Sequence, residues 1–346
     1  MATKKLTVVI SQSQGKNPAK HQLEEELTAA LMMEPVVDVS LVPHLYDLSG
    51  DHTGTIFLRS LPGDSIVLAW MYPRATRWIL DRHGMKGRAG VTLLKNDDED
   101  DFEDDRPDNN EPDGIGSVDV PDRKIYCVDL RDHSDAQVYL DEILRIANDK
   151  SVQTVDLMSW IQGQPKAEQL QRYLHSTSTI DPSNAASENA GDIGQFDHAV
   201  KRRWYPVIDY DRCTNCMECI DFCLFGVYGV DKLDRILVEQ PDDCKKGCPA
   251  CSRVCPENAI VFPGHKTPAI AGADGEIGGL KIDLSKLFGA PSALDVAIRE
   301  RDVELVDDGR EAVGMTVGIP KRRVEKQPQE RDELDDLIDS LNDLDL

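Results

Sequence analysis

The spacing of cysteines constrains this chain more than any other feature of its sequence. Eight of the nine cysteines in 346 residues lie between Cys213 and Cys255. The first four follow the spacing C-x2-C-x2-C-x3-C, and the next four follow C-x3-C-x2-C-x3-C-P. In a chain with the composition of a cytosolic protein, cysteines clustered in this way are typical of metal ligands rather than of disulfides. We therefore expect this segment to fold around metal.

The two cysteine blocks resemble those of the bacterial-type ferredoxins, which hold two 4Fe-4S cubanes. The resemblance covers about residues 203–263, and the rest of the chain is not recognised. Two departures stand out: Leu224 occupies a position where the family usually has proline, and one extra residue separates Cys244 from Cys248. Neither departure removes a ligand, so the resemblance implies a small α+β ferredoxin-like domain.

The resemblance also implies which cysteines share a cluster. In such ferredoxins, three cysteines of one block and the fourth cysteine of the other block bind each cluster. The implied ligands of the first cluster are Cys213, Cys216, Cys219 and Cys255. The implied ligands of the second cluster are Cys223, Cys244, Cys248 and Cys251. Metal binding would supply folding free energy that a module of about 60 residues otherwise lacks.

Two other metal sites are compatible with parts of this pattern. Zinc could be bound by eight thiolates in two tetrahedral sites, although zinc ribbons usually separate two C-x2-C pairs. The spacing from Cys244 to Cys251 is, by itself, that of the radical-SAM enzymes. However, Cys255 and Pro256 follow at once, and the remaining residues are too few for a barrel of roughly 200 residues.

Alternating strand and helix patterns before the cysteines predict an α/β domain over residues 1–165. The predicted strands are 6–11, 36–42, 65–71, 89–94 and 124–130. The predicted helices are 18–33, 52–61, 74–83 and 134–149. This alternation favours a doubly wound fold with a mainly parallel sheet.

The net charge of −24 is concentrated in two segments. Residues 97–113 hold eleven acidic residues and one arginine, and residues 325–346 hold nine acidic and two basic residues. The first segment predicts an acidic disordered insertion over residues 96–117. The other predicted segments are a linker (176–202), a small C-terminal extension (264–318) with a helix that begins after Ser292, and an acidic tail with a short amphipathic helix (319–346).

Composition also bears on location and partners. The acidic charge argues against non-specific binding to nucleic acid. No apolar run approaches the roughly 20 residues of a membrane helix, and the run near the N-terminus is too short for the core of a signal peptide. We therefore expect a cytoplasmic protein that has neither nucleic acid nor membrane as a partner. The sequence does not determine the oligomeric state.

The loop after the first predicted strand is a candidate cofactor site. Ser11, Ser13 and Gly15 lie where an α/β sheet can bind a phosphate, and the loop faintly resembles the flavodoxin phosphate loop. Neither a G-x-G-x-x-G nor a Walker pattern is present. A flavin or phosphate site and an ordinary polar turn are both compatible with these residues.

Two further features lie outside the cysteine blocks. Cys127 falls within a predicted strand, and we expect it to be a buried apolar side chain rather than a ligand. Arg74, Arg77 and Lys86 could form an anion site, but a solvated helix face with long apolar stems is the more usual arrangement.

The favoured function is single-electron transfer through two 4Fe-4S clusters to a redox partner protein. No catalytic residues stand out, so an electron carrier is favoured over a stand-alone enzyme. One alternative is an oxidoreductase whose N-terminal domain binds a flavin or substrate served by the clusters. Another is a scaffold or redox-sensing protein in which the clusters are structural.

Overall fold

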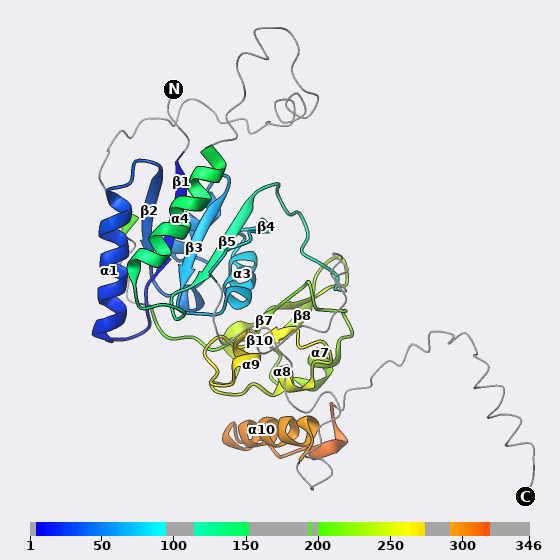
Figure 1. Ribbon diagram of the computed structural model, residues 1–346. Coiled ribbons are helices and arrows are strands. Elements are labelled where there is room, and N and C mark those ends of the chain that lie inside the picture. The colour runs from blue at the N-terminus through cyan, green and yellow to red at the C-terminus, as the bar shows by residue number, and fades with distance from the viewer. Residues whose placement is uncertain (1–4, 95–113, 152–193, 196–199, 274–290, 319–346) are drawn as a thin grey trace, which may run out of the picture.

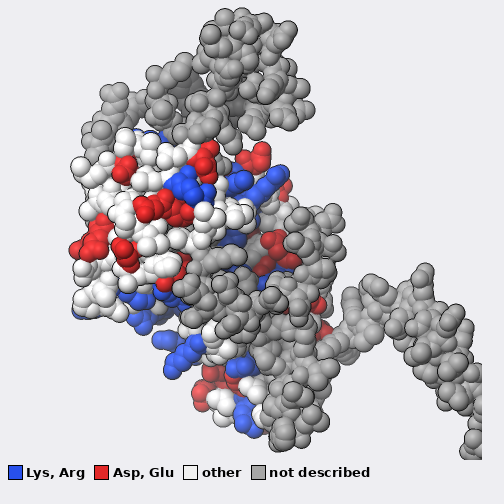
Figure 2. All heavy atoms as spheres, viewed as in Figure 1, with Lys and Arg blue, Asp and Glu red and all other residues white. Residues whose placement is uncertain are grey.

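The computed structural model describes residues 5–94, 114–151, 194–195, 200–273 and 291–318 (Figure 1). These residues form an α/β domain, a small cysteine-containing module packed beside it, and a helix beyond the module. Among them, no helix is long and apolar enough to cross a membrane. Acidic and basic side chains both occur on the face of the molecule shown in Figure 2. The acidic stretch 97–113 and the tail 319–346 lie outside the described residues.

The α/β domain is built on a six-stranded sheet in which every described pair is parallel. The strands are β1 (Leu6–Ser11), β2 (Val37–Val42), β3 (Ser65–Ala69), β4 (Arg88–Ala89), β5 (Lys124–Asp129) and β6 (Gly194–Gln195). Their order is β4-β5-β3-β1-β2-β6. The prediction of a parallel α/β sheet is therefore confirmed. Because β2 and β3 lie on opposite sides of β1, the chain changes direction along the sheet there, and ligands of such sheets commonly bind beyond the carboxyl ends of these strands.

Helices cover both faces of this sheet. On one face lie α1 (Pro18–Met32) and α4 (Ala136–Ser151), whose apolar side chains, such as Leu27 and Ile143, form one core with β1 and β3 (Figure 1). On the other face lie α2 (Thr53–Ser60) and α3 (Pro73–Arg82), which contribute Leu58 and Ile79 to a second core. With cores on both faces, strands such as β3 are buried along their whole length.

Two of the predicted boundaries are wrong. The strand expected over 89–94 ends at Ala89, because Val91 and Leu93 are exposed and the Leu93 amide donates to Glu142 on α4 rather than to a strand. Residues 114–117, expected within the disordered insertion, are hydrogen-bonded. The amides of residues 114–116 donate to the carbonyls of Asp211, Cys213 and Tyr210, respectively. Net charge carries no information about such backbone pairing between distant segments.

A third boundary differs at the other edge of the sheet. Residues 194–195, predicted within a linker, form β6 and pair in parallel with Ser40 and Leu41 of β2. A two-residue strand has no detectable period, so the pattern of the sequence could not reveal it. The rest of the predicted linker up to residue 193 lies outside the described residues.

The cysteine-containing module, residues 203–263, consists of two similar halves. Strand β7 (Val207–Ile208) pairs antiparallel with β10 (Ile260–Val261), and β8 (Tyr228–Val230) pairs antiparallel with β9 (Ile236–Val238). Each half also contains a one-turn helix, α7 (Glu218–Phe222) or α8 (Ala250–Val254). The two helices contact each other, so the ends of both cysteine blocks meet in the middle of the module.

The module packs against α3 of the α/β domain. Tyr205, Val207 and Val261 belong to the same apolar core as Trp78 and Ile79 of α3. The Tyr46 hydroxyl accepts a hydrogen bond from the Tyr205 amide at 2.7 Å and donates to the Tyr205 carbonyl at 2.5 Å. The domain and the module therefore share a continuous interior.

The side chain of Arg74 on α3 crosses the same interface. Nε of Arg74 lies 2.6 Å from Oδ2 of Asp209, and both side chains are more than nine-tenths buried. Arg77 and Lys86 donate to the backbone carbonyls of Gly87 and Val118. Arg74 is therefore neither part of a solvated face nor available to an external anion, because its partner in the module neutralises it.

Helix α10 (Ala293–Asp307) lies on the side of the module away from the α/β domain (Figure 1). It begins where expected, at Ser292, whose side chain accepts from the Asp295 amide while the Asp295 carboxylate accepts from the Ser292 amide. Its buried residues Ala297 and Ile298 pack against Val254 of α8. Helix α10 of the predicted C-terminal extension therefore covers the part of the module that contains the second cysteine block.

Candidate metal centre

The first set of four cysteines lines one small pocket. Its members come from the loop after β7, from α7 and from the end of α8, and they are Cys213, Cys216, Cys219 and Cys255. The loop is turned by Asn215 and Met217, which both have positive φ. The Asn215 side chain connects the loop to the strand pair β8 and β9. It donates to the Asp234 carbonyl and accepts from the Ile236 amide, each at 2.9 Å.

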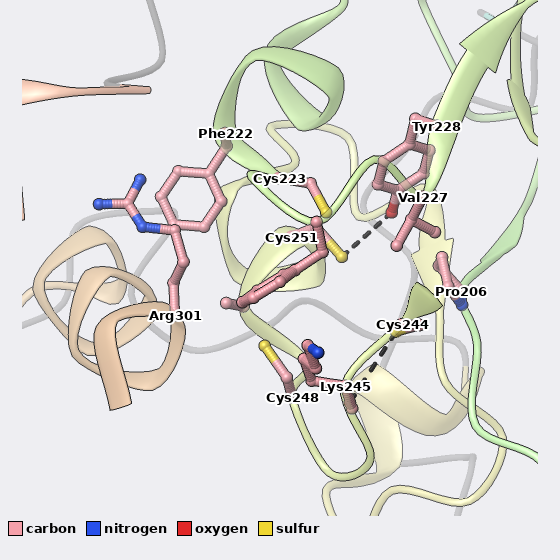
Figure 3. A pocket seen from close by; sticks show the side chains of 12 residues that line it. Pro206, Phe222, Cys223, Val227, Tyr228, Cys244, Lys245, Cys248, Cys251 and Arg301 are labelled. Atoms are coloured by element: carbon pink, nitrogen blue, oxygen red, sulfur yellow. Dashed lines mark hydrogen bonds between the residues drawn. The ribbon is translucent and has the colours of Figure 1, made fainter. Parts of the chain in front are cut away.

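The second set lines another pocket, which Figure 3 shows from close by. Its cysteines are Cys223, Cys244, Cys248 and Cys251. The other walls include Phe222, Val227 and Tyr228 from the first half of the module and Arg301 from α10. The pocket is therefore closed partly by the helix that follows the module in the chain.

The two pockets group the cysteines as the ferredoxin resemblance implied. Cys223 is the C-terminal cap of α7, and Cys255 is the C-terminal cap of α8. Each one-turn helix carries its last cysteine away from its own block and into the pocket lined by the other block. Metal ligation by these eight residues stays a prediction, and the structure adds that their side chains gather in two groups of four.

Burial keeps most of these thiols protonated in the absence of metal. It raises the pKa of seven of the eight, to about 12 for Cys248 and Cys255. Because a thiolate is the metal ligand, loading these pockets must release protons. Metal would therefore have to compensate for the cost of placing several negative sulfurs in an apolar interior.

Backbone amides partly offset that cost, and they do so symmetrically. The amide of Ala259 donates to Sγ of Cys255 at 3.2 Å. Against the larger effect of burial, the amides of Glu257 and Ala259 lower the pKa of Cys255, and those of Phe225 and Val227 lower the pKa of Cys223. The donors thus stand two and four residues after the last cysteine of each block. In each half, two backbone amides at the same positions therefore stabilise the corresponding sulfur.

The spatial arrangement of the sulfurs also indicates which metal group suits the two pockets. Four zinc-bound thiolates lie about 3.8 Å apart, as follows from Zn–S distances of about 2.3 Å. Among the described residues, no three His, Cys, Asp or Glu side chains converge in a way that could hold a single ion. The cysteines instead surround two pockets. An iron–sulfur cubane, in which each thiolate binds a different iron, suits four ligands arranged around a space.

Cys127 lies apart from both pockets. It is buried in β5, and burial raises its pKa to about 12. Its neighbours in the second core of the domain are apolar, including Val67 and Ile79. It is therefore placed as a small apolar side chain.

The candidate phosphate loop lies at the carboxyl end of β1, where the sheet changes direction, but a carboxylate already occupies it. The Ser13 amide donates to Oε1 of Glu24 at 2.6 Å, and Glu24 is buried. The Ser11 hydroxyl accepts from the Leu45 amide at 3.0 Å, and the Gly15 carbonyl bonds to His21 at 2.8 Å. A phosphate would have to displace Glu24 or be repelled by it, so these residues do not fit a flavin phosphate as they stand.

Sequence reasoning missed two residues of the second pocket. The hydroxyl of Tyr228 donates to Sγ of Cys251 at 3.0 Å, and the buried guanidinium of Arg301 lies over the Phe222 ring (Figure 3). Nothing in the local pattern around Tyr228 distinguishes it from an ordinary strand residue. Arg301 stands 46 residues after Cys255 in the chain, so only the packing of α10 brings it to the pocket.

Curated relatives match only a short part of the chain. An uncharacterized ferredoxin of Methanocaldococcus jannaschii is 50% identical over 66 residues, which are 19% of this chain and 44% of that protein. A ferredoxin of Methanothermococcus thermolithotrophicus is 40% identical over 56 residues, which are 16% of this chain and 90% of that protein. The pyruvate synthase subunit PorD of M. jannaschii is 36% identical over 60 residues, 17% of this chain and 67% of that subunit.

These matches leave most of the chain without a counterpart. This chain spans less than half the length of the first of those relatives. No family model matches the sequence. No solved structure matches it either.

Proposed function

This chain belongs to the ferredoxin family through residues 203–263, and we propose that it transfers single electrons through two 4Fe-4S clusters. The observation that carries the proposal is the pair of pockets, each lined by four cysteines, with Cys223 and Cys255 exchanged between the blocks. The ligands of the first cluster would be Cys213, Cys216, Cys219 and Cys255. The ligands of the second would be Cys223, Cys244, Cys248 and Cys251.

Each bound cluster would accept and release one electron, and the chain's residues would set the conditions for this. Ile208, Ile236 and Ile260 line the first pocket and restrict water. The amides that follow Cys223 and Cys255 stabilise negative charge on sulfur. In such a protein the residues supply position and electrostatics rather than acid–base chemistry.

We propose that the electron partner is another protein. The support is that two of the matched relatives are named as a subunit of pyruvate synthase. The cytoplasmic location, and the expectation that neither nucleic acid nor a membrane is a partner, remain predictions from composition.

The two alternative functions, an oxidoreductase and a scaffold, predict different experimental results. An oxidoreductase with a flavin in the α/β domain would release a yellow chromophore when acid destroys the clusters, and the position of Glu24 in the candidate loop speaks against this. A scaffold with structural clusters would hold iron but would not cycle rapidly between redox states. Electron transfer is favoured because the matched relatives are ferredoxins.

The first experiment is to measure iron, acid-labile sulfide and zinc per chain in protein purified without oxygen. Two cubanes require about eight irons and about eight sulfides. Reduction with dithionite should then produce the electron paramagnetic resonance signal of reduced 4Fe-4S clusters and bleach the visible absorbance. Zinc without sulfide would overturn the proposal. About four irons would mean that one pocket does not hold a cluster.

A further inference from the structure

We propose that the chain holds its two clusters at different reduction potentials, and that the cluster in the pocket lined by Cys223, Cys244, Cys248 and Cys251 is the easier one to reduce. We call this the second pocket, and the one lined by Cys213, Cys216, Cys219 and Cys255 the first pocket. The inference rests on the proposed function. It adds a direction, because electrons that enter at the first pocket would move to the second.

A tyrosine hydroxyl provides the main difference between the pockets. The Tyr228 hydroxyl donates to Sγ of Cys251 at 3.0 Å, and this side chain is buried (Figure 3). Reduction adds negative charge to a cluster and its sulfurs, so a hydrogen bond to a sulfur stabilises the reduced state more than the oxidised state. In a buried setting this donor raises the potential of the second cluster.

The corresponding position in the first pocket has no such donor. Tyr228 stands five residues after Cys223 and begins β8, and Ile260 stands five residues after Cys255 and begins β10. Ile260 lines the first pocket, and its side chain cannot donate a hydrogen bond. Thr214 lines this pocket as well, but it is an exposed residue. The two halves of the module therefore differ at this position. One half has a side chain that donates a hydrogen bond to a cysteine sulfur, and the other does not.

Cations differ between the pockets in the same direction. Arg301 and Lys245 line the second pocket, and Arg301 is only 1% exposed. The lining of the first pocket includes Glu257 and, among the described residues, no lysine or arginine. A nearby positive charge favours the more negative, reduced state of a cluster, and a carboxylate disfavours it.

Acidic residues around the second pocket reduce the effect of its two cations on the reduction potential. They do not remove the effect of the hydrogen bond from Tyr228. Arg301 lies 3.2 Å from Asp302, and Lys245 lies 2.6 Å from Asp308. The carboxylates of Glu300 and Glu304, also on α10, raise the pKa of Cys248. Their negative charges therefore oppose the positive charges of the two cations. None of these four carboxylates lines the pocket, whereas both cations and Tyr228 do.

One electron would leave a reduced cluster bound in the first pocket and would be added to an oxidised cluster bound in the second. No bond forms or breaks, and Tyr228 keeps its proton throughout. The initial electron comes from the external reductant, which is dithionite in the experiment below.

The test is a potentiometric titration of the anaerobic holoprotein, followed by electron paramagnetic resonance. We expect two separate one-electron steps in the wild-type chain. Tyr228→Phe keeps the ring and removes only the hydroxyl. At a fixed applied potential it should lower the ratio of reduced to oxidised second cluster by about threefold to tenfold, the equivalent of one hydrogen bond. The lower-potential step should not move.

Two controls separate this effect from a general loss of structure. Tyr139→Phe removes a buried hydroxyl that bonds to the Asp129 carbonyl on the far side of the α/β domain, and it should leave both steps unchanged. Arg301→Lys should retain the higher step better than Arg301→Gln, because it keeps the charge.

Failure of this inference can be distinguished from failure of the proposed function. A chain without about eight irons and eight sulfides would contradict the proposed function itself. Eight irons with two coincident steps would overturn the inference alone. So would a Tyr228→Phe protein with full iron content in which the higher step does not move, or in which the lower step moves instead.

Discussion

At the scale of single residues, burial and contacts distinguish the ninth cysteine from the other eight. Cys127 is enclosed by apolar side chains of the α/β domain, whereas Cys216 lines the first pocket. Their different positions allow a matched pair of substitutions that remove one thiol each. The comparison tests ligation directly, because both variants lose the same chemical group.

We predict that Cys216→Ala loses about half of its iron and sulfide, because a cubane that lacks one of its four thiolates is not retained. Cys127→Ala should keep the wild-type content. The measurement is iron and acid-labile sulfide per chain after anaerobic purification. Equal losses in the two variants would contradict the assignment of Cys216 as a ligand.

A second residue-scale prediction concerns His83, at the end of α3. Burial lowers its pKa to about 4, helped by nearby arginines. The unfolded chain, with an ordinary pKa near 6.5, therefore binds the proton first as pH falls, so folding stability is lost from about pH 6.5 downwards. Between pH 7.5 and 5.5 we expect His83 to contribute about 1 kcal/mol to this loss.

The measurement is denaturant unfolding of the holoprotein at several pH values in that interval. His83→Gln should flatten the pH dependence by about that amount compared with the wild-type chain. Parallel slopes for the two proteins would show that His83 is not buried in its neutral form. The interval stays above pH 5.5 so that acid does not destroy the clusters.

At the scale of elements, α10 illustrates how local signals and packing cooperate. The pairing of Ser292 with Asp295 starts the helix, and its apolar residues then pack on α8 beside the second pocket. A helix of 15 residues is marginal on its own in water, so its stability comes mainly from this packing. The cap supplies a smaller and separable contribution.

We predict that Ser292→Ala destabilises α10 by about 1 kcal/mol, the usual cost of losing an N-terminal cap. Amide hydrogen exchange within residues 293–307 should accelerate about fivefold at that cost, while exchange in β1 and β3 stays unchanged. Ser60→Ala removes an exposed hydroxyl at the end of α2 and serves as the control. Unchanged exchange in α10 would mean that packing alone determines the helix.

At the scale of the whole molecule, the ion pair of Arg74 and Asp209 joins the α/β domain to the module. It is buried on both sides, and Asp209 also accepts from the Asp211 amide in the turn that leads to Cys213. The position of the first cysteine loop is thus linked to α3. The domain therefore acts as a support for the module as well as a neighbour.

We predict that Arg74→Met destabilises the holoprotein by about 3 kcal/mol, because it leaves the buried Asp209 carboxylate without its main partner. The control is Arg88→Gln, which breaks a pair exposed on both sides and should cost less than about 0.5 kcal/mol. Denaturant unfolding measured by far-ultraviolet circular dichroism checks both values. A small effect of Arg74→Met would mean that Arg212, 3.6 Å from Asp209, compensates for the loss.

The sequence by itself determined the local features of this protein. Apolar periodicity placed β1, β2, β3 and β5 and the helices between them to within a few residues, because these patterns depend on neighbours along the chain. The cysteine spacing identified the ferredoxin segment for a similar reason: short loops allow few arrangements of the ligands. The family resemblance supplied the grouping of the cysteines.

Only the tertiary structure decided what lies beside what. It added β6 to the edge of the sheet, paired Arg74 with Asp209, and brought Tyr228 and Arg301 to the second pocket. These contacts join segments that are far apart in the chain, and their formation depends on how whole elements pack. No local period or spacing encodes such a contact. The difference between the two pockets therefore became visible only once α10 and the two halves of the module were in place.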